Sequence, residues 1–87
     1  MNLHGIEQFR IDLKLPLLIL RGKRGVLACG YLNLETFNKT GEAAAIVTGV
    51  KSFEDMLDSH VVGISKAGEA AGFRIGMPGA EVLEIIR

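Results

Sequence analysis

Two consecutive apolar stretches near the N-terminus constrain the fold more than any other feature of this sequence. Residues 17–20 read Leu-Leu-Ile-Leu and residues 26–29 read Val-Leu-Ala-Cys, with the short segment 21–25 between them. Gly22 and Gly25 allow the positive φ angles that tight turns require, so the pattern predicts a β-hairpin. Because every position of both predicted strands is apolar, the hairpin needs cover on both of its faces.

The segment before the hairpin, residues 8–15, predicts one more strand with a single buried face. Polar and apolar side chains alternate strictly along it, which is the period-two pattern of a β-strand. The apolar positions are Phe9, Ile11, Leu13 and Leu15. Pro16 then ends or bends the strand, because proline lacks the N–H group that a central ladder needs. Residues 8–31 are therefore predicted to be β-rich.

Helix-capping residues mark a change of structure after the hairpin. Asn33 is a suitable N-cap for a short helix that Gly41 ends, and Ser52 is a suitable N-cap for a second helix. Between these two helices, the small apolar residues 43–47 predict a further strand. Residues 33–87 are therefore predicted to mix helices with one or two strands.

The last part of the chain predicts two more helices, with one ambiguity. Apolar and small residues recur at helical spacing over residues 61–71, although Val61 to Ser65 also fits a short strand. Pro78 fits the first position of a final helix, where its missing N–H costs little. The predicted buried side of that helix consists of Val82, Leu83 and Ile86. Together the elements predict one small α+β domain over residues 1–87, in which an antiparallel sheet carries its helices on one side.

Charge and composition argue against several classes of function. The chain of 87 residues is 48% hydrophobic and 23% charged, which is typical of a globular domain. Its ten basic and ten acidic residues balance, so we expect no nucleic-acid partner, whose binding would depend on neutralising phosphates. Residues 1–30 carry a net charge of +3 and residues 31–87 a net charge of −3. This asymmetry reflects two ordinary solvated faces, or complementarity between subunits.

The cysteine and histidine content limits redox and metal chemistry. With one cysteine, Cys29, and two histidines, His4 and His60, we expect no intramolecular disulfide, no metal site and no cofactor. The longest uncharged apolar run, residues 15–20, is far shorter than the ~20 residues that span a bilayer. The N-terminus also lacks the long apolar core of a signal peptide. We therefore expect a cytoplasmic protein without membrane association.

The apolar hairpin also predicts self-association. The short helices offer enough apolar surface to cover one face of the hairpin, so the other face needs a second partner. We expect that partner to be another copy of the same chain, because obligate interfaces resemble a domain core cut in half and symmetric association is common. The predicted interface residues are Leu17, Leu18, Ile19, Leu20, Val26 and Leu27.

Three segments resemble a known family in the same order along the chain. Residues 25–34, residues 48–58 and residues 72–83 are similar to the central segment, the glycine–valine turn with its helix, and the closing motif of the YunC-like family. This bacterial and archaeal family has no assigned function. The resemblance covers roughly residues 9–87 and implies an N-terminal β-sheet region that mediates tetramer formation. It supplies no catalytic residue, and this chain departs from the pattern in a short hairpin turn and in Pro78.

Few residues are candidates for chemistry. Cys29 lies at the end of a predicted strand, close before a helix N-terminus, where a thiol can act as a nucleophile. It would need a base, for which His60 is the main candidate, and the alternative is that Cys29 only packs in the core. Gly76 and Gly79 flank the start of the last helix, where free N–H groups could bind an anion, or where they could simply form a tight turn.

The sequence assigns no reaction, and three functions stay open. The favoured one is a homo-oligomeric structural, interaction or regulatory domain, most simply a tetramer. The second is a small-ligand module that binds an anion or phosphorylated metabolite at a subunit junction, near residues 76–79 or residues 49–52. The third is a cysteine-dependent enzyme that uses Cys29, with His60 from a neighbouring subunit. The balance of these interpretations is against an enzyme.

Overall fold

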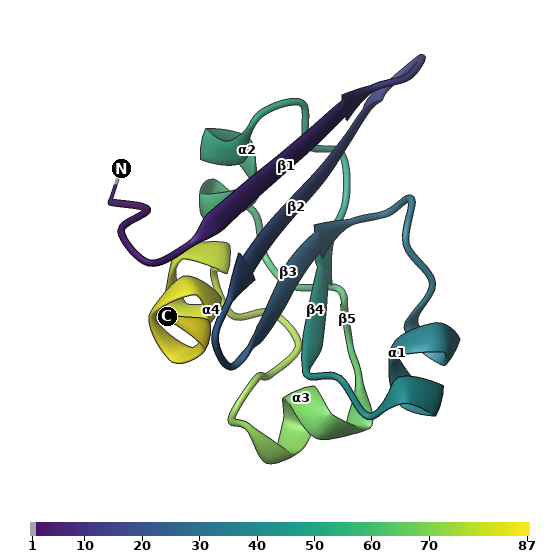
Figure 1. Cartoon of the computed structure of the whole chain (residues 1–87), viewed down its shortest axis with the longest axis vertical. Coiled ribbons are helices and arrows are strands. Elements are labelled where there is room, and N and C mark those ends of the chain that lie inside the picture. The colour runs from purple at the N-terminus through teal and green to yellow at the C-terminus, as the bar shows by residue number, and fades with distance from the viewer. Residues whose placement is uncertain (1) are drawn as a thin grey trace.

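Five strands form one sheet in the order in which they occur along the chain (Figure 1). The computed structural model describes residues 2–87. The strands are β1 (Glu7–Asp12), β2 (Pro16–Gly22), β3 (Gly25–Cys29), β4 (Ala44–Val47) and β5 (Gly63–Ile64). The predicted α+β class and the hairpin between the two apolar stretches are confirmed, with Leu20 opposite Leu27 in the β2–β3 register.

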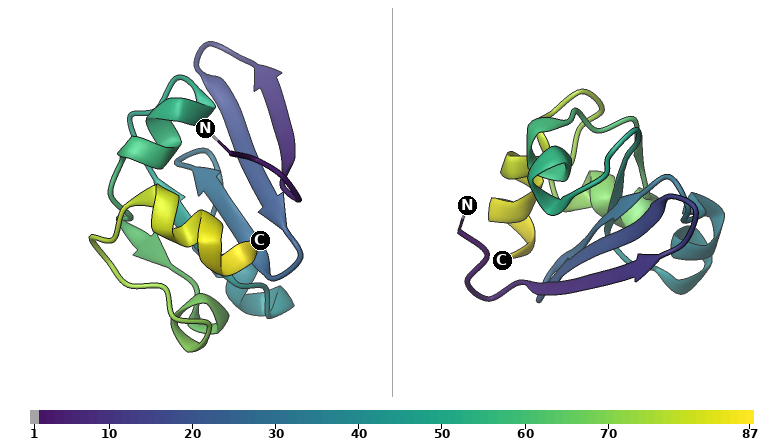
Figure 2. Two further views of the ribbon diagram at one scale, coloured as in Figure 1. Left: turned by 90° about the vertical axis from the view of Figure 1, so that its left-hand side faces the viewer. Right: turned by 90° about the horizontal axis from the view of Figure 1, so that it is seen from above.

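The sheet is mixed, and helices lie on both of its faces. β3 and β4 pair in parallel, and α1 (Leu34–Thr40) connects them because parallel strands cannot be joined by a tight turn. Leu34 and Phe37 of α1 pack on Val26 and Ile46. The helices α2 (Phe53–Asp58) and α4 (Gly79–Ile86) cover the opposite face (Figure 2). The expectation of an antiparallel sheet with helices on one side is therefore wrong.

Both predicted capping residues begin their helices. The Asn33 side chain accepts a hydrogen bond from the Glu35 N–H at 2.8 Å, and the Ser52 hydroxyl accepts one from the Asp55 N–H at 3.0 Å. Gly41 ends α1 in the left-handed conformation, with a φ of 78° that glycine adopts at no steric cost. The capping chemistry alone was thus sufficient to place these two helices.

The predicted helix over residues 61–71 is wrong in its first half, where the alternative of a short strand holds. The chain forms β5 there and turns helical only at α3 (Lys66–Ala70). The buried hydroxyl of Ser65 accepts hydrogen bonds from the N–H groups of Ala44 and Gly68 and donates one to the Glu42 carbonyl. Ser65 therefore caps α3 and attaches it to β4 at the same time. If the helix continued through residue 65, Ser65 would no longer be at its N-cap and could not make both contacts.

The main core lies between the sheet and the helices α2 and α4. Fully buried leucines of β2 and β3 meet α4, whose predicted buried residues are confirmed, while Pro78 occupies the N-cap position rather than the first helical position. The core residues from these elements are Leu18, Leu20, Leu27, Cys29, Val82, Leu83 and Ile86. Gly22 packs directly on the Ile86 carbonyl, so the hairpin turn is held against the C-terminal end of α4.

The antiparallel ribbon of β1 and β2 forms the outer edge of the sheet. All six residues of β1 are exposed to solvent, and residues 13–15 form the turn to β2. The strand predicted over residues 8–15 therefore ends at Asp12. Figure 2 shows the ribbon extending past the helices, and its outward face, which carries Phe9 and Ile11, is exposed to solvent.

Candidate functional site

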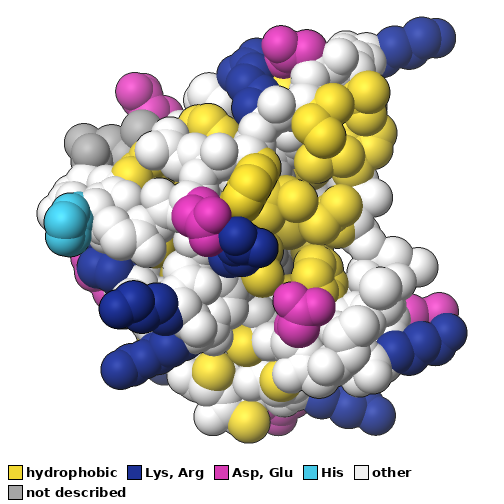
Figure 3. Space-filling model, in the orientation of Figure 1, with side chains coloured by type: hydrophobic (Ala, Val, Ile, Leu, Met, Phe, Trp, Pro, Cys, Tyr) yellow, Lys and Arg dark blue, Asp and Glu magenta, His cyan; other side chains and the backbone are white. Residues whose placement is uncertain are grey.

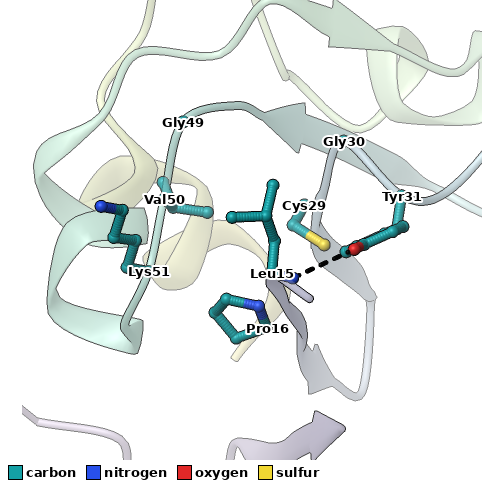
Figure 4. A pocket seen from close by; sticks show the side chains of 8 residues that line it. All are labelled: Leu15, Pro16, Cys29, Gly30, Tyr31, Gly49, Val50 and Lys51. Atoms are coloured by element: carbon teal, nitrogen blue, oxygen red, sulfur yellow. Dashed lines mark hydrogen bonds between the residues drawn. The ribbon is translucent and has the colours of Figure 1, made fainter. Parts of the chain in front are cut away.

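A groove of about 450 Å³ lies where the ribbon turn meets the ends of β3 and β4 (Figure 4). Because β3 and β4 are parallel, the segments that follow them leave the sheet at the same edge. The turn before β2 reaches this edge and completes the groove. The lining residues are Leu15, Pro16, Cys29, Gly30, Tyr31, Gly49, Val50 and Lys51.

Two hydrogen bonds attach the ribbon to the end of β3 beside this groove. The Leu15 N–H donates to the Tyr31 hydroxyl at 3.3 Å, as drawn in Figure 4, and the Leu18 N–H donates to the Cys29 sulfur at 3.3 Å. Tyr31 was not among the residues that the sequence suggested. Its hydroxyl bond to a residue 16 positions away depends on the folded hairpin, so no local signal could reveal it.

Cys29 lines the groove, but the geometry of a nucleophile and a base is missing. Its side chain is buried, and only 3% of the residue is exposed. His60 is exposed just after the C-terminal end of α2, where it forms an isolated β-bridge with Pro78, and it is not a lining residue of the groove. His4 lies in the N-terminal segment, where its carbonyl accepts a hydrogen bond from Arg87. Neither histidine is brought to the thiol within this chain.

The anion site considered near Gly76 and Gly79 has no free donors at these two residues. The Gly76 N–H donates to the Val61 carbonyl and the Gly79 N–H donates to the Ser59 carbonyl, both at 2.8 Å. A Cβ atom at Gly79 would also collide with the Met56 carbonyl. Glycine is therefore needed at position 79 for the close approach of α4 to α2, and the turn interpretation explains this motif.

Half of the residues predicted for a subunit interface are completely buried in their own chain. Leu18, Leu20 and Leu27 point into the core under α2 and α4 and have no exposed surface. Val26 is buried on the other face, where α1 packs, while Leu17 and Ile19 are half-buried. Of the predicted interface residues, Leu17 and Ile19 therefore keep exposed surface that a partner could contact, and the interface itself stays a prediction.

Most of the large exposed apolar side chains gather along the ribbon and around its turn, where Figure 3 shows a yellow patch, whereas Val62 and Ile75 lie elsewhere. We define this ribbon patch by its large exposed residues: Phe9, Ile11, Leu13, Leu15 and Tyr31. Between Phe9, Phe37 and Ile19 the same face is hollowed by about 280 Å³. Arg21 lies over the Phe9 ring at 5.1 Å and pairs with Glu7, which places charge beside the patch.

Two classes of site are absent from the part of the chain that the structure describes. Among residues 2–87, no three side chains of histidine, cysteine, aspartate or glutamate lie close enough together to hold a metal ion. No helix in this range combines the length and apolar character needed to cross a bilayer.

Comparison with known proteins places the chain in a family. The sequence profile described as "Domain of unknown function (DUF1805)" matches residues 28–86, and the chain belongs to this family. It is 28% identical over 80 residues to the uncharacterized protein YunC of Bacillus subtilis (strain 168), a match that covers 84% of this chain and 79% of that protein. The resemblance noted in the sequence is thereby confirmed.

A solved structure has the same fold. The crystal structure of TA1206, a protein of unknown function from Thermoplasma acidophilum, matches with a TM-score of 0.82 and 32% identity, over 94% of this chain and 93% of that one. The α+β architecture is therefore shared with TA1206. The names of both of these proteins leave their function open, so the function of the domain must be argued from its own surface.

Proposed function

We propose that this domain is a homo-oligomeric interaction module whose copies associate through the ribbon patch. One observation carries the proposal. Four large apolar side chains of the ribbon and its turn, together with Tyr31 beside that turn, are each between 40% and 57% exposed. Burying apolar surface is the main favourable term in association, and contiguous exposed patches are typical of interaction sites.

The geometry of the ribbon favours a second copy as the partner. All six residues of β1 are exposed, and a twofold axis would place the same patch on both copies face to face. The hollow beside Phe9 could receive a side chain from the opposing ribbon. The opposite net charges of residues 1–30 and residues 31–87 give each copy both signs of charge, which supports association of like chains.

The number of subunits and the compartment are finer parts of this proposal. A tetramer is the assembly that membership of the YunC-like family implies, and the ribbon belongs to the N-terminal β-region to which that assembly is attributed. A cytoplasmic location is supported by Cys29, which is free and buried, since secreted small domains more commonly pair their cysteines. The proposal that copies associate through the ribbon patch does not depend on the number of subunits or on the compartment.

Native mass spectrometry of the untagged protein tests the proposal. We expect a dominant species of four subunits, and a dimer at low protein concentration. A monomer at every concentration would contradict self-association and would direct attention to a different protein as the partner of the ribbon patch. A dimer that never assembles further would agree with association through the ribbon patch but would contradict the tetramer.

The alternative of a cysteine-dependent enzyme gains no support from the geometry. Catalysis would require a base within hydrogen-bond reach of the Cys29 thiol, and among residues 2–87 no histidine or carboxylate residue lines the groove around it. The ligand-binding alternative keeps one of its two proposed locations, because residues 49–51 line the groove.

A further inference from the structure

We propose that β1 is a detachable edge strand and that Arg87 holds it on the sheet by clasping the segment before it. We call this segment, residues 2–6, the strap. The strap passes beside the C-terminal end of α4, as Figures 1 and 2 show, and continues directly into β1 at Glu7. Whatever holds the strap to α4 therefore also holds the start of β1.

β1 contributes little of its own to the packing of the fold. All six of its residues are exposed, and it pairs with β2 at one edge of the sheet. A segment with few buried apolar contacts can open locally while the rest of the fold stays closed. The position of β1 therefore depends on its two ends, which are the strap and the turn where the Leu15 N–H donates to the Tyr31 hydroxyl.

The clasp consists of hydrogen bonds from one guanidinium group to main-chain atoms of the strap. Arg87 donates from Nη1 to the His4 carbonyl at 2.6 Å and from Nη2 to the Asn2 carbonyl at 2.9 Å. The Glu84 carboxylate accepts from Nε and Nη2 of the same guanidinium, both at 3.3 Å, and so orients it. Because the Arg87 side chain is only 23% exposed, these bonds are partly shielded from water. A lysine could not make this set of contacts, because it lacks the planar fork of donors.

Apolar contacts and one glycine shape the strap for this clasp. Ile6 is buried in the main core, and Leu3 packs against the same core. Gly5 has a φ of 79°, which glycine adopts at no steric cost, and it lies next to the Arg87 side chain. A Cβ atom at this position would lie 3.7 Å from the Arg87 Cγ, so the backbone conformation, and not the space, requires glycine.

Release of β1 would divide the ribbon patch, because Phe9 and Ile11 belong to β1. This consequence rests on the proposed self-association. The chain with β1 in place would be the associating form, and the clasp would set the fraction of chains in that form. Arg87 lies outside the ribbon patch and would act on association only as a positioning residue. Since both copies of a dimer need β1 in place, the apparent dissociation constant should rise with the inverse square of that fraction.

Hydrogen–deuterium exchange in dilute protein, followed by mass spectrometry, tests the clasp. Arg87→Met keeps the apolar stem and removes the donors, so peptides that cover β1 should exchange roughly tenfold faster, whereas peptides that cover β3 and β4 keep their rates. Gly5→Ala should give the same pattern, because it strains the strap without touching the donors. The control Arg74→Met removes only an exposed ion pair with Glu81 and should change no rate. Unchanged exchange of β1, or equal acceleration throughout the sheet, would overturn the proposal.

Sedimentation equilibrium in urea tests the link to association. At the urea concentration that releases β1 in half of the Arg87→Met chains, the variant should have a dissociation constant about fourfold above that of the unmodified chain. Equal constants would overturn this link, and release of β1 only together with β3 would overturn the detachable strand. Faster exchange of β1 in a chain that never associates would support the clasp and contradict the proposed function instead.

Discussion

Replacing Ile11 by alanine should weaken self-association without unfolding the chain. Ile11 is 55% exposed, and complete burial of an isoleucine side chain stabilises by about 1.5–3 kcal/mol. Covering the exposed half therefore contributes about 1 kcal/mol. A twofold interface contains the residue twice, so Ile11→Ala should cost the dimer about 2 kcal/mol, or roughly thirtyfold in its dissociation constant.

Sedimentation equilibrium measures this change, and the chain offers a matched control. Ile75 is 61% exposed and lies between α3 and α4, next to the segment that pairs with Val61 at the opposite edge of the sheet from β1. Ile75→Ala should leave the dissociation constant unchanged. The reasoning is refuted if both variants weaken association equally, or if Ile11→Ala leaves the constant as it was while its circular dichroism remains native.

Three further predictions concern stability and reactivity. Ser65→Ala should lower the free energy of unfolding by about 2–4 kcal/mol in urea titrations, because it removes the N-cap of α3 and leaves the buried Ala44 N–H without a partner. The control Ser59→Ala, at an exposed hydroxyl, should lower it by less than about 1 kcal/mol. A thermal melt of Gly79→Ala should show loss of the folded state because its Cβ would collide with the backbone of α2, whereas Gly41→Ala, in open space, should cost only about 1–2 kcal/mol from its positive φ. Cys29 should react with N-ethylmaleimide much more slowly in the folded chain than in urea, and equal rates would restore the hypothesis of a reactive thiol.

Local chemistry explains the elements that could be predicted from the sequence. The β2–β3 hairpin follows from two apolar stretches around glycines, and Asn33 and Ser52 begin helices through hydrogen bonds to N–H groups two or three residues away. These interactions are complete within a few residues, so no knowledge of the rest of the fold is needed. The family resemblance rests on similar short segments.

Long-range contacts explain what could not be predicted. Residues 17–20 are apolar at every position, so they carry no alternation that would show which side chains face α4 and which face outward. The parallel pairing of β3 with β4 depends on how α1 packs, and Ser65 acts through bonds to residues more than 20 positions away. Phe9 and Ile11 alternate with polar residues, and this alternation predicted that their side of the strand is buried. In the folded chain that side is exposed and forms the outward face of the ribbon.

The candidate site shows the same division. Cys29 and residues 49–52 were both considered from the sequence, but for separate functions and at separate places. Only the folded chain brings Cys29, Tyr31 and residues 49–51 to one groove beside the ribbon turn. Gly76 and Gly79 instead serve main-chain contacts, which their position before a helix could not distinguish from an anion site.

Isotope-filtered NOE spectra on a mixture of ¹³C-labelled and unlabelled protein test the central claim most directly. They detect protons of one copy that lie close to protons of another. Association through the ribbon patch predicts intermolecular cross-peaks from the methyl groups of Ile11 and Leu13 and from the Phe9 ring. Cross-peaks confined to Val62 and Ile75, or their complete absence at millimolar protein concentration, would contradict it.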